Sequence, residues 1–307
     1  MPHSRDNRRR IDKRLKAIKT RLKFLQKRYE KERCSGQTIR LPFVSLGDLR
    51  AAFKPKHTPM DPSLLEASKQ FRRVLRNPNK SLFIHGSDGG LLAYRGSLRD
   101  DEILSTLTES LALLPQRTNL KFRGVYRGKY STRHYCVWCP YQKRPYVSRE
   151  LKADGEAGLA FLKSNKRLWN RISDMLGQIS PGTYRRFLRY PLPDQLERFC
   201  TAFAGCVVNL GGQDPVQTAP HRDVKESIYG YSCVVPAGDY SGGALILYDL
   251  KLIVELGPGD VIFFPDSLIH HANEDVQGNR SSIVAFTQEN LFHYWGRKYK
   301  YFNNNKR

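Results

Sequence analysis

A histidine and an aspartate stand two residues apart in the stretch TAPHRDVKES, residues 218–227. In an extended chain, residues i and i+2 point to the same face, so His221 and Asp223 can direct an imidazole and a carboxylate at one point. Two histidines and one carboxylate on one face form the ligand set of Fe(II) centres for oxygen chemistry, with three positions left open. A surface turn closed by the aspartate side chain is the simpler interpretation of the same residues.

A third ligand for such a centre is available downstream, in the stretch PDSLIHHANED. His270 and His271 both lie there. Strand alternation points neighbouring side chains to opposite faces, so only one of the two can complete the ligand set. The residues by themselves leave the choice between them open.

Arg280 and Ser282 follow in the stretch NRSSIVAF, whose composition is typical of a strand and places both side chains on one face. A guanidinium holds a carboxylate through two parallel hydrogen bonds, and a hydroxyl adds a further donor. This pair suits the distal carboxylate of 2-oxoglutarate, a keto acid whose other end chelates iron. Because all these residues fall within about sixty positions, the pattern favours one iron and 2-oxoglutarate site over separate surface features.

From position 200 onward these residues lie in short β-rich runs separated by Gly, Pro and Asp turns. This pattern is typical of a β-sandwich or β-barrel. Upstream, helical periodicity predicts helices over 61–76, 100–114 and 158–176. Near the N-terminus, apolar residues recur at spacings of three and four and predict a helix that packs on its own domain or lies along an anion. They are Ile11, Leu15, Ile18, Leu22, Leu25 and Tyr29.

The segment from about 203 to 290 resembles the Fe(II)/2-oxoglutarate dioxygenase superfamily. The resemblance rests on VVNLGGQDPVQTAPHRDVKESIYGYSCVVPAGDYSGGALIL, GDVIFFPDSLIHHAN and RSSIV. Within the superfamily it is most similar to the TET/JBP group, in particular its fungal members, and GVYRGKYSTRHYCVWC and PYVSRE extend it to about residues 120–290. It implies an α+β fold with a double-stranded β-helix core, of the jelly-roll or cupin kind, and flanking helices.

The resemblance also implies an activity and a site. The activity is that of an Fe(II)/2-oxoglutarate-dependent dioxygenase, which uses O2 to oxidise the methyl group of 5-methylcytosine in DNA. His221, Asp223 and His271 match the catalytic iron ligands, because LIHHAN aligns best through its second histidine. Arg280 matches the 2-oxoglutarate anchor and Ser282 its helper. Base-contacting residues do not transfer, since VKES and AFTQ depart from the animal members.

The net charge of +23 is unevenly distributed. Residues 1–40 carry 15 Lys and Arg against 4 Asp and Glu, residues 41–199 carry 28 against 14, and residues 200–292 carry 4 against 11. Residues 110–149 hold nine cations, no acid and several aromatic rings. Such a segment favours contact with DNA, whose target base must be flipped out to reach a buried metal. Arg123, Arg127 and Lys129 are the candidate DNA contacts.

These features divide the chain into four parts. We expect a basic helical extension over 1–40, a basic helical and mixed region over 41–199 that packs on the core and contacts DNA, a β-helix catalytic core over 200–292 and a basic tail over 293–307. No apolar run reaches the length of a membrane helix and no secretory signal is present, which predicts an intracellular protein. The basic N-terminal run indicates the nucleus. The oligomeric state is not indicated.

Two other functions are compatible with the same residues. One is a 2-oxoglutarate oxygenase that acts on thymine, RNA or protein. The other is a catalytically silent nucleic-acid-binding module with the same fold. The presence of both the HxD pair and the RxS pair argues against the silent module.

Overall fold

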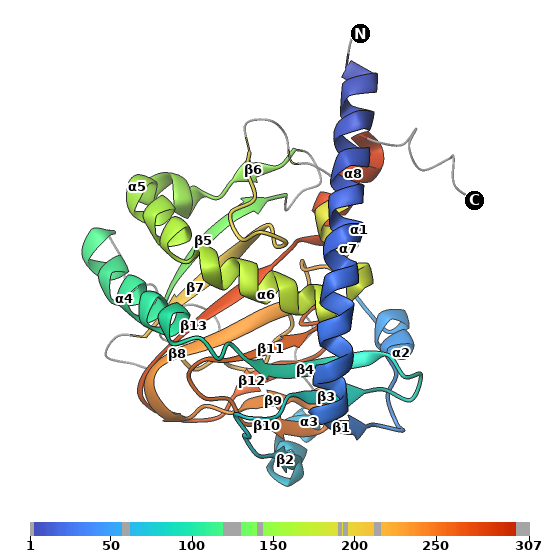
Figure 1. The fold of residues 1–307 in the computed structure, drawn as a ribbon. Helices are drawn as coiled ribbons and strands as arrows, with labels where there is room; N and C mark the ends of the chain where they lie inside the picture. Colours follow the sequence, from blue (N-terminus) through green and yellow to red (C-terminus); the bar gives the residue numbers. More distant parts are fainter. Residues whose placement is uncertain are drawn as a thin grey trace.

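The computed structural model describes residues 3–56, 62–118, 130–139, 144–189, 192, 196–211 and 216–298. Within these ranges the chain forms eight α-helices and two β-sheets (Figure 1). The helices are α1 (His3–Ser35), α2 (Leu46–Ala51), α3 (Pro62–Ala67), α4 (Asp101–Arg117), α5 (Arg149–Ser164), α6 (Lys166–Ile179), α7 (Pro181–Arg189) and α8 (Glu289–Lys298).

The strands are contributed by both halves of the chain. The first group is β1 (Gln37–Arg40), β2 (Arg72–Val74), β3 (Leu82–His85), β4 (Leu91–Ser97), β5 (Ser131–Trp138) and β6 (Tyr146–Val147). The second group is β7 (Gly205–Leu210), β8 (Ser232–Gly242), β9 (Leu245–Leu247), β10 (Leu252–Val254), β11 (Asp260–Phe264), β12 (His271–Asn273) and β13 (Val276–Phe286).

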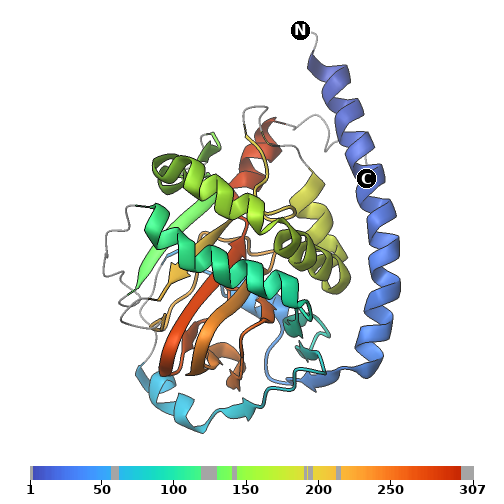
Figure 2. The same ribbon diagram turned by 60° about the vertical axis from the view of Figure 1, so that its left-hand side comes forward.

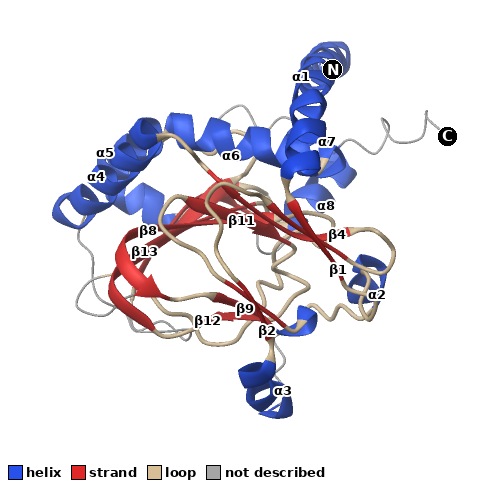
Figure 3. Ribbon diagram, turned by 60° about the horizontal axis from the view of Figure 1, so that its bottom comes forward, coloured by secondary structure: helices blue, strands red, loops and turns tan. Residues whose placement is uncertain are grey.

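The larger sheet has nine strands in the order β1-β3-β4-β11-β8-β13-β7-β5-β6, and the smaller has four in the order β12-β9-β10-β2. The two sheets face each other, and helices α4, α5 and α6 cover the outer face of the larger one (Figure 3). The molecule is therefore a three-layer arrangement of helices, large sheet and small sheet.

Apolar side chains fill both interfaces between these layers. One buried cluster joins the helices to the large sheet and includes Trp169 and Phe263. A second joins the two sheets and includes Leu247, Val254 and Phe264. The burial of large side chains on both faces makes the large sheet a rigid support for residues that point into the space between the sheets.

Helix α1 packs on α6 and α7 through its apolar stripe, as the spacing predicts. Ile11, Ile18, Leu22 and Leu25 are at most 6% exposed. Arg21 Nε donates to Asp174 Oδ1 on α6 at 3.0 Å. Figure 2 shows that the N-terminal end of the helix projects beyond the body of the molecule. In the described part of the chain, no helix combines the length and the apolar character needed to span a bilayer.

The other predicted helices differ in outcome. The helix at 100–114 is confirmed as α4, and the Asp100 side chain caps it by accepting from Ile103 N at 3.1 Å. The single helix predicted over 158–176 is wrong in one respect, because the chain breaks at Asn165, where α5 ends and α6 starts.

The helix predicted over 61–76 is wrong beyond its first turns. Helix α3 ends at Ala67, and Arg72–Val74 form strand β2, which pairs in parallel with β10. Val74 is buried against the apolar cluster between the sheets. A partner strand almost two hundred residues away in the sequence outweighs the local helical pattern.

Candidate metal centre and cosubstrate pocket

Main-chain hydrogen bonds hold the two histidines of the candidate centre opposite each other. His221 N donates to the carbonyl of His271 at 3.0 Å, and His271 N donates to the carbonyl of His221 at 2.9 Å. Asp223 N donates to the carbonyl of Asp266 at 3.0 Å. His271 begins strand β12, which pairs with β9 in the small sheet. The loop that carries His221 and Asp223 is therefore fixed at both residues, to strand β12 by His221 and to the segment after β11 by Asp223.

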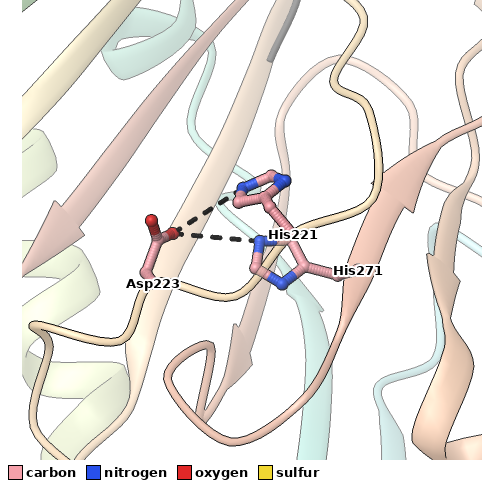
Figure 4. Close-up of side chains that lie close together, drawn as sticks. All are labelled: His221, Asp223 and His271. Atoms are coloured by element: carbon pink, nitrogen blue, oxygen red, sulfur yellow. Dashed lines mark ion pairs between the residues drawn. The ribbon is translucent and has the colours of Figure 1, made fainter. Parts of the chain in front are cut away.

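The side chains of these three residues converge (Figure 4). Nε2 of His221 and Nε2 of His271 each lie 3.9 Å from Asp223 Oδ2. One ligand atom from each residue lies within 4.8 Å of the other two. The two imidazole side chains are 7% and 8% exposed, and the Asp223 side chain is 23% exposed. The three donors thus surround one point that is accessible from one side.

The orientation of both imidazole rings is set by backbone carbonyls. His221 Nδ1 lies 2.7 Å from the carbonyl of Ala219, and His271 Nδ1 lies 2.9 Å from the carbonyl of Ile269. Because a carbonyl oxygen only accepts, each Nδ1 carries the proton and donates it. In both rings Nε2 then has the lone pair, as a metal-binding histidine requires.

The donor set decides which group this site can hold. Two neutral imidazole nitrogens and one carboxylate oxygen on one face fit a divalent transition metal such as Fe(II). Among the residues that the structure describes, this is the one cluster of three His, Cys, Asp or Glu side chains with that spacing.

The structure also separates the two adjacent histidines of PDSLIHHANED. His270 turns away, with its Nδ1 3.2 Å from Asp249 Oδ2 and its backbone N–H donating to the same oxygen at 2.6 Å. His271 alone joins His221 and Asp223. This is the geometry that strand alternation predicts for neighbouring residues.

A cavity of about 430 Å³ extends from this cluster between the two sheets. Its lining includes all five residues that the resemblance assigns to iron and 2-oxoglutarate: His221, Asp223, His271, Arg280 and Ser282. The predicted DNA contacts Arg123, Arg127 and Lys129 lie outside the described residues.

Arg280 is the most unusual residue in the cavity. Its side chain comes from β13 and is 2% exposed. Nη1 donates to the carbonyl of Val216 at 2.6 Å, while the buried Nε has no hydrogen-bond partner in the described part of the chain. Burial lowers the pKa of Arg280, and the nearby Tyr240 hydroxyl acts in the opposite direction. In the described ranges no carboxylate pairs with this guanidinium, so the site lacks the anion that a buried charge requires.

Ser282 lies on the same face of β13, two residues further along. Its Oγ accepts a hydrogen bond from Asn209 Nδ2 at 3.1 Å, and Asn209 is its register partner on β7. Asn209 also lines the cavity. The sequence interpretation missed Asn209, although one signal was available: a polar residue interrupts the apolar run CVVNL.

No family profile and no curated protein sequence matches the chain. Among solved structures, it is similar to NgTET1 in complex with 5mC DNA, with a TM-score of 0.58, 19% sequence identity, and coverage of 74% of this chain and 89% of the other. This likeness shows that the chain has a TET-like fold.

Two further structures match less closely. One is a 2OG-Fe(II) oxygenase family oxidoreductase from Burkholderia pseudomallei, with a TM-score of 0.38, 13% identity and coverage of 82% and 94%. The other is OsALKBH1, with a TM-score of 0.40, 15% identity and coverage of 64% and 96%. Their TM-scores are too low to support a conclusion about the fold of this chain.

Proposed function

We propose that the protein is an Fe(II)/2-oxoglutarate-dependent dioxygenase with a double-stranded β-helix core that oxidises the methyl group of 5-methylcytosine in DNA. One observation carries the proposal. A single cavity holds a cluster of two histidines and one aspartate together with a buried guanidinium that has no carboxylate partner in the described part of the chain.

The residues have distinct roles in this proposal. His221, Asp223 and His271 hold Fe(II), with Nδ1 of each imidazole fixed by a backbone carbonyl so that Nε2 faces the metal. Arg280 receives the distal carboxylate of 2-oxoglutarate and is neutralised by it. Asn209 orients the Ser282 hydroxyl through their hydrogen bond. Ser282 donates its own proton to the same carboxylate.

When bound, iron and 2-oxoglutarate supply the oxidising power that converts a C–H bond to an alcohol. The chain supplies a closed environment for that step. Phe264, Val234 and Leu245 line the cavity beside the cluster and limit access of water. The two imidazole side chains are almost buried, so a methyl group must enter from the side where Asp223 is exposed.

DNA as the substrate is supported by two observations. The fold is shared with a protein that was solved with 5mC DNA. The chain also carries a net charge of +23, concentrated outside the segment that bears the metal cluster. A methyl group in a stacked base cannot reach this cavity, so the nucleotide must be flipped into it. The basic N-terminal run supports a nuclear location.

Nucleoside mass spectrometry tests the function. The full chain is incubated with Fe(II), 2-oxoglutarate, O2 and duplex DNA that contains 5-methylcytosine. We expect 5-hydroxymethylcytosine to form in step with succinate. Asp223→Ala protein is the matched control and should form neither product. Iron-loaded protein that leaves 5-methylcytosine intact but releases succinate with RNA, a protein or thymine-containing DNA would refute the assigned substrate.

A further inference from the structure

Arginine side chains and aromatic rings alternate along one surface of the protein, beside the cavity. The Arg222 guanidinium lies 5.9 Å from the ring of Phe53, and those of Arg50 and Arg186 each lie 5.0 Å from the ring of Tyr229. Arg186 also lies 4.0 Å from the ring of Phe292. We refer to these six residues as the arginine–aromatic row.

Four segments that are distant in the sequence build this row, one of them the loop that carries Arg222 and Tyr229. Arg50 and Phe53 belong to one turn at the end of α2, where Phe53 N donates to the carbonyl of Arg50 at 3.3 Å. Arg186 lies on α7 and Phe292 on α8. Helices α2, α7 and α8 lie on the same side of the molecule in Figures 1 and 3.

The row is continuous with the loop that carries the metal cluster. Arg222 stands between His221 and Asp223, and its side chain is absent from the cavity lining. Lys225 lines the cavity and is exposed, which marks the cavity mouth. Tyr229 follows four residues later and is 51% exposed. Glu289, which pairs with Arg186 of the row, donates its backbone N–H to the carbonyl of Lys225 at 3.1 Å, so the row lies next to this mouth.

The guanidiniums of the row are positioned but only partly neutralised. Arg186 pairs with Glu289 at 2.7 Å. Arg50 Nε donates to the carbonyl of Ile228 at 3.1 Å, yet in the described ranges neither Arg50 nor Arg222 forms an ion pair with a carboxylate. Ring contacts hold these cations in place, since an aromatic face attracts a guanidinium without removing its charge.

We propose that the arginine–aromatic row binds the phosphate backbone of duplex DNA next to the nucleotide that enters the cavity. Fixed guanidiniums recognise phosphates through bidentate hydrogen bonds. Consecutive phosphates along a strand present the repeated negative charge that a row of cations matches. Tyr229 is a positioning residue in this surface, because its ring holds Arg50 and Arg186 at once. The proposal rests on the proposed function for its choice of DNA.

Binding can be measured separately from catalysis. Fluorescence anisotropy of a labelled duplex, titrated with the full chain between about 50 and 200 mM salt, gives the slope of log affinity against log salt. Arg50→Gln should reduce that slope by about one unit, because one phosphate contact is lost. Arg72→Gln is the matched control, since Arg72 is an exposed arginine on β2 outside the row. It should leave the slope close to that of the unaltered protein.

The ring is tested by two substitutions at Tyr229. Tyr229→Ala should weaken binding roughly three- to tenfold at low salt, because both guanidiniums lose the ring that orders them. Tyr229→Phe keeps the ring and should bind like the unaltered protein, which also covers the case in which the alanine variant fails to fold. A purely structural role would instead lower the melting temperature of Tyr229→Ala and leave its DNA affinity unchanged.

The surface and the proposed function fail in different ways. The proposal that the row binds DNA would be overturned if Arg50→Gln and the unaltered protein had equal slopes. It would also be overturned if Arg72→Gln reduced the slope as much as Arg50→Gln. Such a result could still accompany full conversion of 5-methylcytosine. A reduced slope in Arg50→Gln supports the surface even if no oxidised base is formed, because the binding measurement needs neither iron nor 2-oxoglutarate.

Discussion

Backbone carbonyls, and not carboxylates, orient the two imidazole rings of the candidate centre. The carbonyls of Ala219 and Ile269 each belong to the residue two positions before the histidine they orient. The ring orientation is therefore determined locally, by the conformation of two short loops. Replacing one histidine should remove a ligand without disturbing the other ring.

This independence gives a direct test of the ligand set. His271→Ala should lower the affinity for Fe(II) more than a hundredfold, since loss of even an outer partner of a metal ligand typically costs ten- to a hundredfold. His270→Ala should retain iron, because His270 contacts Asp249 on the other side of the strand. Iron content after dialysis, measured by mass spectrometry, distinguishes the two variants. The reverse pattern would exclude His271 as the ligand.

The buried guanidinium gives a second test at the same scale. Removing one partner of a buried charge pair costs about 2–5 kcal/mol. Arg280→Ala should therefore raise the 2-oxoglutarate concentration for half-maximal turnover about thirtyfold or more. The 2-oxoglutarate requirement of Arg280→Lys should lie between those of the unaltered protein and Arg280→Ala, since lysine keeps the charge but lacks the planar fork. A succinate assay over a range of 2-oxoglutarate concentrations measures both. An unchanged requirement in Arg280→Ala would contradict its role as the anchor.

Some residues of the candidate site can be predicted from the sequence pattern, and others cannot. Spacing was sufficient for Arg280 with Ser282, because strand periodicity fixes which side chains share a face. It also brought together His221 and Asp223, although these two lie in a loop held by backbone hydrogen bonds. Asn209 and Tyr240 reach the same region from β7 and β8. Their proximity depends on the register of three strands, which no local pattern in this sequence specifies.

At the scale of elements, helix α1 shows how an apolar stripe determines packing. Leu25 is completely buried against the main cluster, whereas its neighbour Phe24 is 52% exposed. Gly177 on α6 allows this approach, since an added Cβ there would lie 2.5 Å from Leu25 Cδ1. The basic N-terminal segment is thus attached to the body by close contacts.

Two adjacent substitutions test this attachment. Leu25→Ala should lower the free energy of unfolding by about 2–5 kcal/mol, because it leaves a cavity between α1 and α6. Phe24→Ala removes a larger side chain from the surface and should change the free energy of unfolding by about 0.5 kcal/mol or less. Urea denaturation followed by circular dichroism compares them. Similar losses in both variants would show that α1 does not contribute to the core through this stripe.

The same scale explains why the helix predicted over 100–114 was correct and the helix predicted over 61–76 failed beyond its first turns. Helix α4 has a cap, acidic residues in its first turn and an apolar face, and all three signals agree. The segment 61–76 has a helical pattern, yet its last part pairs with β10 and buries Val74. Long-range pairing of this kind carries no local signature, so a prediction from periodicity alone fails there.

At the scale of the whole molecule, acidic and basic residues are concentrated in different segments, although both halves of the chain contribute strands to the large sheet. The segment 200–292 is net acidic and supplies β7 to β13, whereas β5 from the basic segment also lines the cavity through Thr132, His134 and Trp138. The basic segments supply the surrounding helices and the outer strands of the large sheet. The charge pattern was readable from the sequence, whereas the addition of β1, β3, β4 and β5 to the sheet was not. A polyanion would approach such a molecule along its periphery.

The position of β13 also matters for how the chain is made. This strand lies between β8 and β7, near the centre of the large sheet, and it is the last strand in the described part of the chain. Until the ribosome releases it, the nascent protein holds two half-sheets with unpaired inner edges, one ending at β8 and the other at β7. Open apolar edges of this kind promote aggregation. Synthesis that stops before residue 276 therefore yields a chain that needs chaperones and lacks the proposed anchor for 2-oxoglutarate, because Arg280 belongs to the strand that closes the sheet.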